Sequence, residues 1–345
     1  MQLPREVIVG KGTILRVLEV TQRLNLTGSA LIIAGERSCK IAGETVQNLL
    51  ETASITAESI IIENASAETI TAIEERIREL KPTVLFAVGG GSKIDAAKLS
   101  AACHGIPFIS IPTTLSHDGI ASPLASVKGL DKPYSIMAQA PLAVIADTDI
   151  IAQAPWRFAI SGCGDVISKF TAVKDWQLAH AEKNEYYGEY AASLALMSMR
   201  LVMQNAKLIQ PNNQEGLRVL LEALISCGVA MSIAGSSRPC SGSEHLFSHA
   251  LDVLKNNHAM HGEQCGVGSI LSAYLHNADW QQIRNTLKQI QAPTTAAELG
   301  VEDEDVVKAL AMAASIRPER YTILHKLRLT YEACEKVARK TGVIK

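Results

Sequence analysis

Short apolar runs alternate with longer amphipathic segments through the first 150 residues. The apolar runs are rich in β-branched residues and predict strands at 6–9, 30–34, 59–62, 83–88, 108–111 and 142–146. The segments between them predict helices at 13–24, 43–51, 67–80 and 92–103. In the third helix, Ile70, Ile73 and Ile77 recur at the spacing of one helix face, and Ser66 is placed to cap its N-terminus.

This order of elements predicts two domains. Uninterrupted apolar strands separated by helices are typical of buried parallel strands in βαβ units. Residues 1–151 are therefore predicted to form an α/β, Rossmann-like dinucleotide-binding domain with a parallel sheet, and 129–135 to form a turn. After residue 151 the strand-like runs disappear and helical spacing dominates. Residues 152–345 are predicted to form an all-α domain that binds metal and substrate, with loops at 210–214 and 291–295 and the active site in the interdomain cleft.

Composition narrows the class of protein. The 345 residues are 47% hydrophobic and 20% charged, which gives enough apolar material for two packed cores. The net charge of −2 argues against a nucleic-acid partner or an anionic membrane, which would favour a basic surface. No signal-like segment or run of 18 uncharged apolar residues is present, and the seven cysteines contain no CxxC pair. We expect a cytoplasmic homo-oligomer without membrane insertion.

A glycine-rich turn follows the predicted strand 83–88 and opens a helix. Gly89, Gly90, Gly91 and Ser92 would leave free backbone N–H groups at the positive end of the helix dipole. Such a site suits a pyrophosphate, and the carboxyl end of a parallel strand is where open α/β sheets bind ligands. The spacing matches neither GxGxxG nor a Walker A motif, so a simple tight turn between strand and helix remains the alternative.

The segment PTTLSHDG, residues 112–119, directly follows the next strand and is expected at the same sheet edge. It concentrates hydroxyl groups, a histidine and Asp118, and Ser122 lies just beyond it. These side chains could bind ribose, nicotinamide amide and substrate hydroxyls. The alternative is a polar loop whose side chains cap its own turns.

Candidate metal ligands lie in the helical half. The GCGD segment is predicted to begin a helix, which would place Asp165 in the first turn. His245 and His249 are four residues apart and would share one helix face, and His258 and His261 follow closely. One carboxylate with two imidazoles suits a catalytic Zn²⁺, or a similar divalent ion, that keeps positions open for a substrate oxygen.

Several observations weaken that assignment when it is taken alone. Helix histidines are more often surface or hydrogen-bonded residues than ligands, so the HxxxH spacing is only suggestive. The spacing of the nearby cysteines is not typical of a zinc site; these are Cys163, Cys240 and Cys265. The remaining histidines are predicted to be ordinary solvated residues; these are His104, His180, His276 and His325.

Together these motifs resemble the superfamily of iron-type alcohol dehydrogenases, glycerol dehydrogenases and dehydroquinate synthases. Within it, the strongest similarity is to the sn-glycerol-1-phosphate dehydrogenases, and it covers essentially the whole chain. The segment SHDGIASP is the most specific, because glycerol dehydrogenases differ there. The motifs are GGGSKIDAAK (89–98), PTTLSHDGIASP (112–123), GDVISK (164–169), GSEHLFSHALD (242–252) and HG (261–262).

The resemblance implies roles at matching positions. It implies a zinc ion, one per subunit, held by Asp165, His245 and His261. Asp118, Asp165 and His249 would contact the substrate, with Asp165 and His249 as the catalytic residues. Together with the glycine turn, the predicted dinucleotide-binding residues are Gly89, Gly90, Gly91, Ser92, Lys93, Ile94, Asp95, Thr113, Thr114, Leu115, Ser116 and Ser122.

The implied reaction is NAD(P)-dependent reduction of dihydroxyacetone phosphate to sn-glycerol 1-phosphate. Glu36 suits ribose hydroxyls and Arg37 suits a 2′-phosphate, so use of both NAD and NADP is expected. Lys93 departs from the small or apolar residue that many relatives carry. Lys169 and Arg238 are candidates to bind the substrate phosphate. The alternatives are a dehydrogenase for glycerol or another unphosphorylated polyol, a lyase of the dehydroquinate synthase kind, and a regulatory dinucleotide-binding protein.

Overall fold

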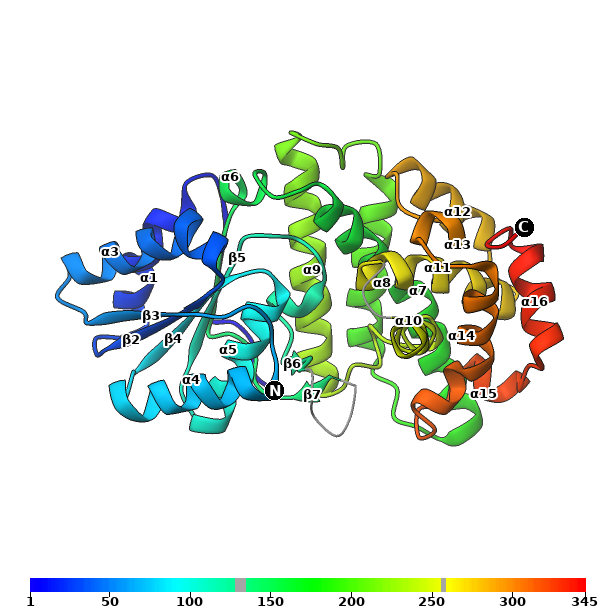
Figure 1. The fold of residues 1–345 in the computed structure, drawn as a ribbon, viewed down its shortest axis with the longest axis horizontal. Helices are drawn as coiled ribbons and strands as arrows, with labels where there is room; N and C mark the ends of the chain where they lie inside the picture. The colour runs from blue at the N-terminus through cyan, green and yellow to red at the C-terminus, as the bar shows by residue number, and fades with distance from the viewer. Residues whose placement is uncertain (128–134, 256–258) are drawn as a thin grey trace. The chain divides into compact units, whose positions relative to one another are not determined.

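The computed structural model describes residues 1–127, 135–255 and 259–345 (Figure 1). The chain divides into two compact units, Met1–Pro155 and Trp156–Lys345. The boundary predicted after residue 151 falls at the end of the short helix α6 (Thr148–Ile151), shortly before this division.

The first unit is built on a six-stranded parallel sheet in the order β1-β8-β5-β4-β2-β3. Strands β2, β4, β5 and β8 are buried along their whole length, which explains their uninterrupted apolar sequences. The parallel α/β fold predicted for this half is thereby confirmed. The strands are β1 (Glu6–Gly10), β2 (Ala30–Ala34), β3 (Ala57–Ile61), β4 (Val84–Gly89), β5 (Phe108–Pro112) and β8 (Ala143–Asp147).

Helices cover both faces of this sheet (Figure 1). The helices between these strands are α1 (Val17–Arg23), the single turn α2 (Glu36–Ser38), α3 (Glu44–Thr52), α4 (Ala67–Leu80) and α5 (Gly91–His104). Helix α4 has the predicted bounds, and Ser66 caps it by accepting a hydrogen bond from the Thr69 N–H. The turn predicted at 129–135 lies almost entirely outside the described residues. The short strands on either side of it, β6 (Leu124–Ala125) and β7 (Ile136–Met137), pair antiparallel.

The chain order across the sheet reverses between β2 and β4. The chain passes from β2 outward to β3, then returns to the other side of β2 to form β4. In open parallel sheets, ligands bind outside the carboxyl ends of the strands at such a switch point. The glycine-rich turn directly after β4 is therefore at the edge where this fold binds ligands.

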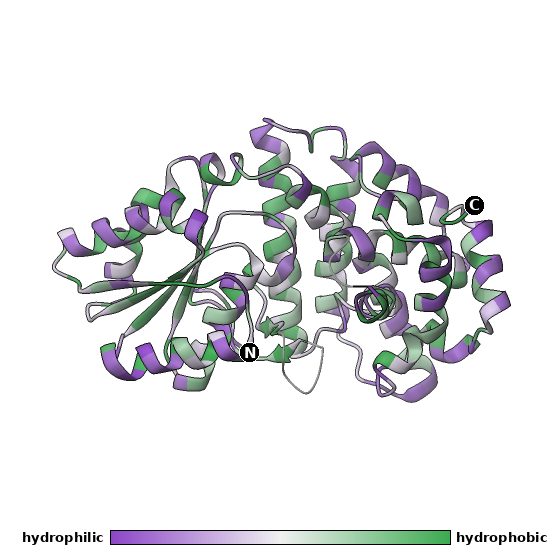
Figure 2. Cartoon of the chain, in the orientation of Figure 1, coloured by the Kyte–Doolittle hydropathy of each residue, from purple (hydrophilic) through white to green (hydrophobic). Residues whose placement is uncertain are grey.

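The second unit is helical, and its described residues contain no strand. Its helices are α7 (Arg157–Lys183), α8 (Glu189–Gln204), α9 (Gln214–Ala234), α10 (Ser243–Leu254), α11 (His261–Leu275), α12 (Trp280–Gln289), α13 (Ala296–Leu299), α14 (Asp303–Ile316), α15 (Ile323–Leu327) and α16 (Tyr331–Lys340). Both predicted interhelical loops are present. By length and hydropathy, helix α9 could cross a membrane (Figure 2). However, 61% of its most apolar window is buried, as in the core helix of a folded protein.

The predicted helix start at GCGD is wrong. Helix α7 begins at Arg157, so Asp165 lies well inside it rather than in its first turn. The glycines serve close packing: a Cβ on Gly164 would lie 2.1 Å from the Gly262 carbonyl oxygen in α11. A Cβ on Gly262 would lie 1.8 Å from the Ser161 carbonyl oxygen in α7. Sequence alone cannot distinguish a glycine that starts a helix from one that lets two helices touch.

Candidate functional site

The glycine-rich turn and the polar loop meet at one edge of the first unit. Gly89 pairs with Pro112 at the ends of β4 and β5, and the Thr113 N–H donates to the Gly89 carbonyl oxygen at 3.0 Å. Helix α5 begins at Gly91, where a Cβ would lie 1.9 Å from His117 Nε2. The small residues thus let the polar loop lie directly against the helix N-terminus, whose backbone N–H groups are suited to bind a phosphate.

A buried lysine that the sequence analysis missed holds this loop in place. Lys98 is fully buried, and its Nζ donates to Asp95 Oδ1 at 2.9 Å, to the Gly119 carbonyl oxygen at 2.9 Å and to the Leu124 carbonyl oxygen at 2.6 Å. It also reaches Ser122 Oγ at 3.4 Å. The only sequence signal was an Asp–Lys pair three residues apart, which could equally have been a surface ion pair. Lys98 orders the segment that contains the predicted contacts Asp118 and Ser122.

Lys93 reaches across the switch point. Its Nζ donates to the Glu63 carbonyl oxygen at 2.7 Å, and its side chain covers Gly35 at the end of β2. Burial lowers the pKa of Lys93. Lys93 therefore places an amine at Gly35, at the carboxyl end of β2.

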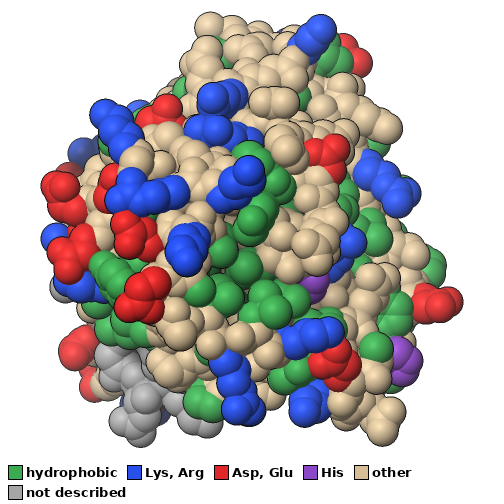
Figure 3. Space-filling view, turned by 90° about the vertical axis from the view of Figure 1, so that its right-hand side faces the viewer, with side chains coloured by type: hydrophobic (Ala, Val, Ile, Leu, Met, Phe, Trp, Pro, Cys, Tyr) green, Lys and Arg blue, Asp and Glu red, His purple; other side chains and the backbone are tan. Residues whose placement is uncertain are grey.

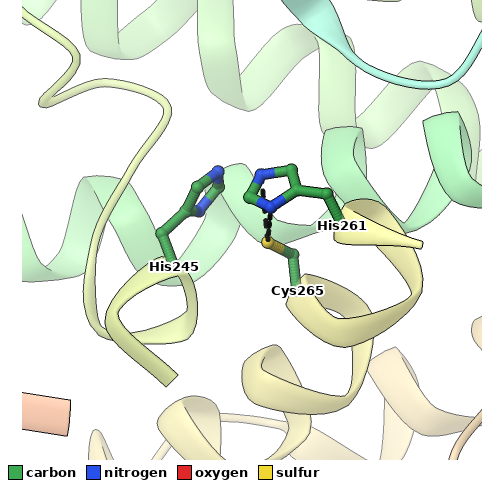
Figure 4. Close-up of side chains that lie close together, drawn as sticks. All are labelled: His245, His261 and Cys265. Carbon is green, nitrogen blue, oxygen red and sulfur yellow. Dashed lines mark hydrogen bonds between the residues drawn. The ribbon is translucent and has the colours of Figure 1, made fainter. Parts of the chain in front are cut away.

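Asp165, His245 and His261 come from three different helices of the second unit and lie close together. His245 Nε2 in α10 is 3.6 Å from Asp165 Oδ1 in α7. The ring centroids of His245 and His261, the latter at the start of α11, are 4.9 Å apart. Figure 4 shows the two imidazoles side by side. Two imidazole nitrogens and one carboxylate oxygen converging in this way form a suitable donor set for a divalent metal ion.

The neighbours of His245 orient its ring for that purpose. Glu244 Oε1 lies 2.8 Å from His245 Nδ1, and Glu244 also accepts from the Gly242 N–H and the Thr171 hydroxyl, each at 2.7 Å. When the carboxylate accepts a hydrogen bond from the Nδ1–H group, Nε2 is the unprotonated nitrogen, and its lone pair is available on the side of Asp165. Burial and the nearby Asp175 raise the pKa of Glu244 to about 7. His261 is held similarly, with Ser248 Oγ 3.2 Å from its Nδ1.

Asp165 is ionised despite being buried. Burial alone would raise its pKa, but the charge of Lys169 and then those of His245 and His261 lower it below its ordinary value. The Lys169 Nζ is 2.7 Å from Asp165 Oδ1 and also donates to the Cys240 carbonyl oxygen at 3.3 Å. A carboxylate held ionised beside two imidazoles is ready to accept a cation.

Cys265 lies within reach of the same site. Its Sγ is 3.5 Å from His261 Nε2, and the donor atoms of His245, His261 and Cys265 all lie within 4.8 Å of one another (Figure 4). Burial raises the pKa of the Cys265 thiol well above its usual value, and Asp165 and Glu244 raise it further. Since the thiolate is the form that binds metals, the ionised Asp165 is the stronger candidate for the third ligand.

The other histidines differ in part from expectation. His249 is half-buried near the cluster, with ring centroids 6.5 Å from His245 and 5.9 Å from His261, and burial lowers its pKa. His180 is exposed, as expected, and His258 lies outside the described residues.

The prediction of solvated side chains is wrong for His276 and His325. His276 Nε2 is 2.9 Å from buried Asp175 Oδ1, and His325 Nδ1 is 3.0 Å from Thr322 Oγ1. Burial lowers the pKa of His325. The contact between His276 and Asp175 has no signal in the local sequence, because the two residues are 101 positions apart, whereas the partner of His325 lies only three residues before it.

The two cations proposed for the substrate phosphate are both buried. Lys169 forms an ion pair with Asp165, as described above. Arg238 donates to Glu185 through Nε at 2.5 Å and to the Tyr321 carbonyl oxygen at 2.9 Å. Its charge is therefore already matched by a carboxylate.

Replacing Glu244 with alanine is expected to weaken metal binding by about 10- to 100-fold, because His245 loses the partner that fixes its orientation. Glu244→Gln should recover much of the loss, since its amide oxygen can still accept from Nδ1. Equilibrium titration of the apoprotein with Zn²⁺ measures both. Equal affinity in wild type and Glu244→Ala would show that Glu244 does not orient His245.

Comparison with known proteins places the chain among similar sequences and folds. A family model described as iron-containing alcohol dehydrogenase matches residues 8–155. A glycerol-1-phosphate dehydrogenase, NAD(P)+, from Thermococcus kodakarensis is 53% identical over 100% of this chain and 98% of its own length. The enzyme of that name from Methanosarcina mazei is 54% identical over 100% of this chain and 96% of its own length.

Solved structures share the fold at lower sequence identity. A probable glycerol dehydrogenase from Sinorhizobium meliloti aligns with a TM-score of 0.80 at 20% identity, over 98% of this chain and 96% of the other. Glycerol dehydrogenase from Schizosaccharomyces pombe gives the same TM-score at 19% identity, over 99% of this chain and 90% of the other.

Proposed function

Because the chain belongs to the glycerol-1-phosphate dehydrogenase family of iron-containing alcohol dehydrogenases, we propose that it reduces dihydroxyacetone phosphate to sn-glycerol 1-phosphate with NADH or NADPH. The product is the glycerol backbone of archaeal-type membrane phospholipids. The observation that carries the proposal is full-length identity above one half with enzymes of that name. The three convergent donors Asp165, His245 and His261 supply chemistry suited to it.

The dinucleotide is proposed to bind at the glycine-rich edge of the first unit. The pyrophosphate would lie on the N–H groups at the start of α5, with the polar loop 113–116 and Ser122 beside it. Lys93 supports use of both dinucleotides, because its amine lies over Gly35, the residue that precedes Glu36 and Arg37 in the sequence. A cation there can accept the 2′-phosphate of NADP, while Glu36 can bind the ribose hydroxyls of NAD.

One zinc ion per subunit is proposed to bind Asp165, His245 and His261, and the donor set fits it. When bound, such an ion acts as a Lewis acid toward the substrate carbonyl oxygen. The surrounding residues prepare the site: Lys169 keeps Asp165 ionised, and Glu244 and Ser248 hold the imidazoles. His249 and Asp118 are proposed to contact the substrate, with His249 passing a proton to or from its hydroxyl group.

Changing Gly90 to valine is expected to raise the Kd for NAD(P)H by about tenfold or more, because the loop could no longer admit the pyrophosphate closely. A Cβ on Gly90 would lie 2.9 Å from Thr114 Oγ1, so added branches would fill the space between the loops. Fluorescence titration measures the Kd. Zinc content serves as the internal control, since the metal ligands belong to the other unit. An unchanged Kd in a folded variant would remove this turn from the cofactor site.

A coupled comparison of substrates tests the proposed reaction. NAD(P)H oxidation is followed with dihydroxyacetone phosphate and with dihydroxyacetone, and the glycerol phosphate formed is analysed on a chiral column. Strong preference for the phosphorylated ketone with sn-glycerol 1-phosphate as product is expected. Preference for dihydroxyacetone would identify a polyol dehydrogenase instead. Turnover of a substrate without net change in nicotinamide absorbance would identify a lyase.

We also propose that the protein is cytoplasmic and forms a homo-oligomer. All seven cysteines are free, which agrees with a reducing compartment. On the face shown in Figure 3, basic and acidic side chains are interspersed rather than gathered into a basic field that would attract nucleic acid or anionic lipid. Analytical ultracentrifugation would measure the oligomeric state.

A further inference from the structure

Three arginines of the second unit, Arg238, Arg317 and Arg320, lie near one another. Arg238 is paired with Glu185, and Arg317 Nε donates to Glu319 Oε1 at 3.0 Å. Among the described residues, Arg320 forms no ion pair. Its Nη1 donates to the Ser241 carbonyl oxygen and its Nη2 to Ser237 Oγ, both at 2.7 Å. Arg320 is therefore a buried positive charge that no bonded carboxylate balances within the described part of the chain.

The unbalanced charge lies next to the candidate metal site. Ser241 directly precedes the turn into α10, the helix that carries His245 and His249. The preceding carbonyl oxygen, that of Cys240, accepts from Lys169, which also binds Asp165. Consecutive peptide groups thus connect the Arg320 guanidinium to the residues around Asp165. The positive charges of Arg317 and Arg320 also help to lower the pKa of His249, which places both near that imidazole.

Burial makes an unpaired arginine costly. Arg320 is 7% exposed, and burial, with the charges of Arg317 and Arg238, lowers its pKa to about 9. Buried charges are normally paired, because hydrogen bonds to neutral groups do not fully offset the free-energy cost of removing a charged group from water. A guanidinium has five N–H donors, and the two hydrogen bonds described leave donors for a further acceptor.

We propose that Arg320 binds the phosphate group of the substrate, at an anion subsite beside His249. This inference rests on the proposed function for the identity of the ligand, a small phosphorylated ketone. The planar guanidinium can bind two phosphate oxygens at once, and the anion would balance the charge that the protein leaves unmatched. Ser237 and Ser241 hold the guanidinium in position while leaving it cationic. Arg238, which the sequence suggested, is neutralised by Glu185 and is not the phosphate ligand.

Substrate discrimination tests the proposal. Arg320→Met is expected to lower kcat/KM for dihydroxyacetone phosphate by about 100-fold, mainly through KM, because a buried charge-assisted contact is lost. The rate with unphosphorylated dihydroxyacetone should stay within about threefold of the wild-type rate, since that substrate has no phosphate group to contact Arg320. Arg320→Lys should recover part of the loss, because it restores the positive charge but cannot bind two phosphate oxygens in a bidentate manner. Equal loss with both ketones would show that Arg320 is only structural and would overturn the proposal.

Direct binding of inorganic phosphate separates this inference from the proposed function. Calorimetry of the zinc-loaded wild-type protein should detect phosphate binding, and Arg320→Met should abolish it. Arg284→Met is the matched control, because Arg284 also donates to a backbone carbonyl oxygen, that of Gly342 at 2.9 Å, but in α12. If the wild type preferred dihydroxyacetone, the proposed function would fail, yet loss of phosphate binding in Arg320→Met alone would still support the anion subsite. Phosphate binding that is equal in wild type and Arg320→Met would refute the subsite.

Discussion

His261→Ala is expected to lower kcat/KM by about 1,000-fold or more while leaving the Kd for NAD(P)H within about twofold. The substitution removes one of only two imidazoles in the donor set, so a bound ion would keep Asp165 and a single histidine. The proposed dinucleotide contacts belong to the first unit and do not include residues of α11. Steady-state kinetics, zinc content by mass spectrometry and fluorescence titration of NADH together measure the effect.

His104→Ala is the control for this experiment, because His104 ends α5 in the first unit and belongs to neither predicted site. Its activity and zinc content should match those of the wild type. Cys265→Ser addresses the competing ligand: the thiol is held protonated by burial, so most of the zinc should remain. Loss of zinc in Cys265→Ser as complete as in His261→Ala would instead make Cys265 a ligand. Full turnover after chelation and dialysis would argue against any catalytic ion.

The fold could be predicted because its central strands are buried on both faces. Residues 30–34 and 84–88 read as apolar runs for that reason, and the structure pairs them as neighbours in the sheet. The helix at 67–80 could be predicted equally well, since it has one apolar face and a serine cap. These signals are local: the chemical nature of each residue follows from its immediate position in a strand or helix.

The site was only partly predictable because its support comes from distant parts of the chain. Asp165, His245 and His261 could be named from their motifs, but the local pattern gave no reason to pair Glu244 with His245 rather than with solvent. Arg320 bonds a carbonyl oxygen 79 positions earlier in the sequence, and nothing in its own segment indicates that contact. Buried polar groups find partners through tertiary packing, so their roles emerge only when helices are assembled.

The close contact between α7 and α11 is the feature that most directly sets the distance between Asp165 and His261. Gly262→Ala would place a Cβ 1.8 Å from the Ser161 carbonyl oxygen, so the two backbones must separate. The expected cost is about 3 kcal/mol in the free energy of unfolding, even though alanine favours a helix over glycine by about 1 kcal/mol. Because His261 is the adjacent residue, the variant should also lose most of its zinc.

Gly266→Ala is the matched control, one helical turn further along α11. Its Cβ would lie 3.2 Å from Leu287 Cδ2, the end of a flexible side chain that can move aside. We expect its stability to change by less than about 1 kcal/mol, with zinc content intact. Urea unfolding and metal analysis of both variants make the comparison. If Gly262→Ala kept wild-type stability and zinc, the metal site would tolerate separation of α7 and α11. The close contact at Gly262 would then not be what sets the distance between Asp165 and His261.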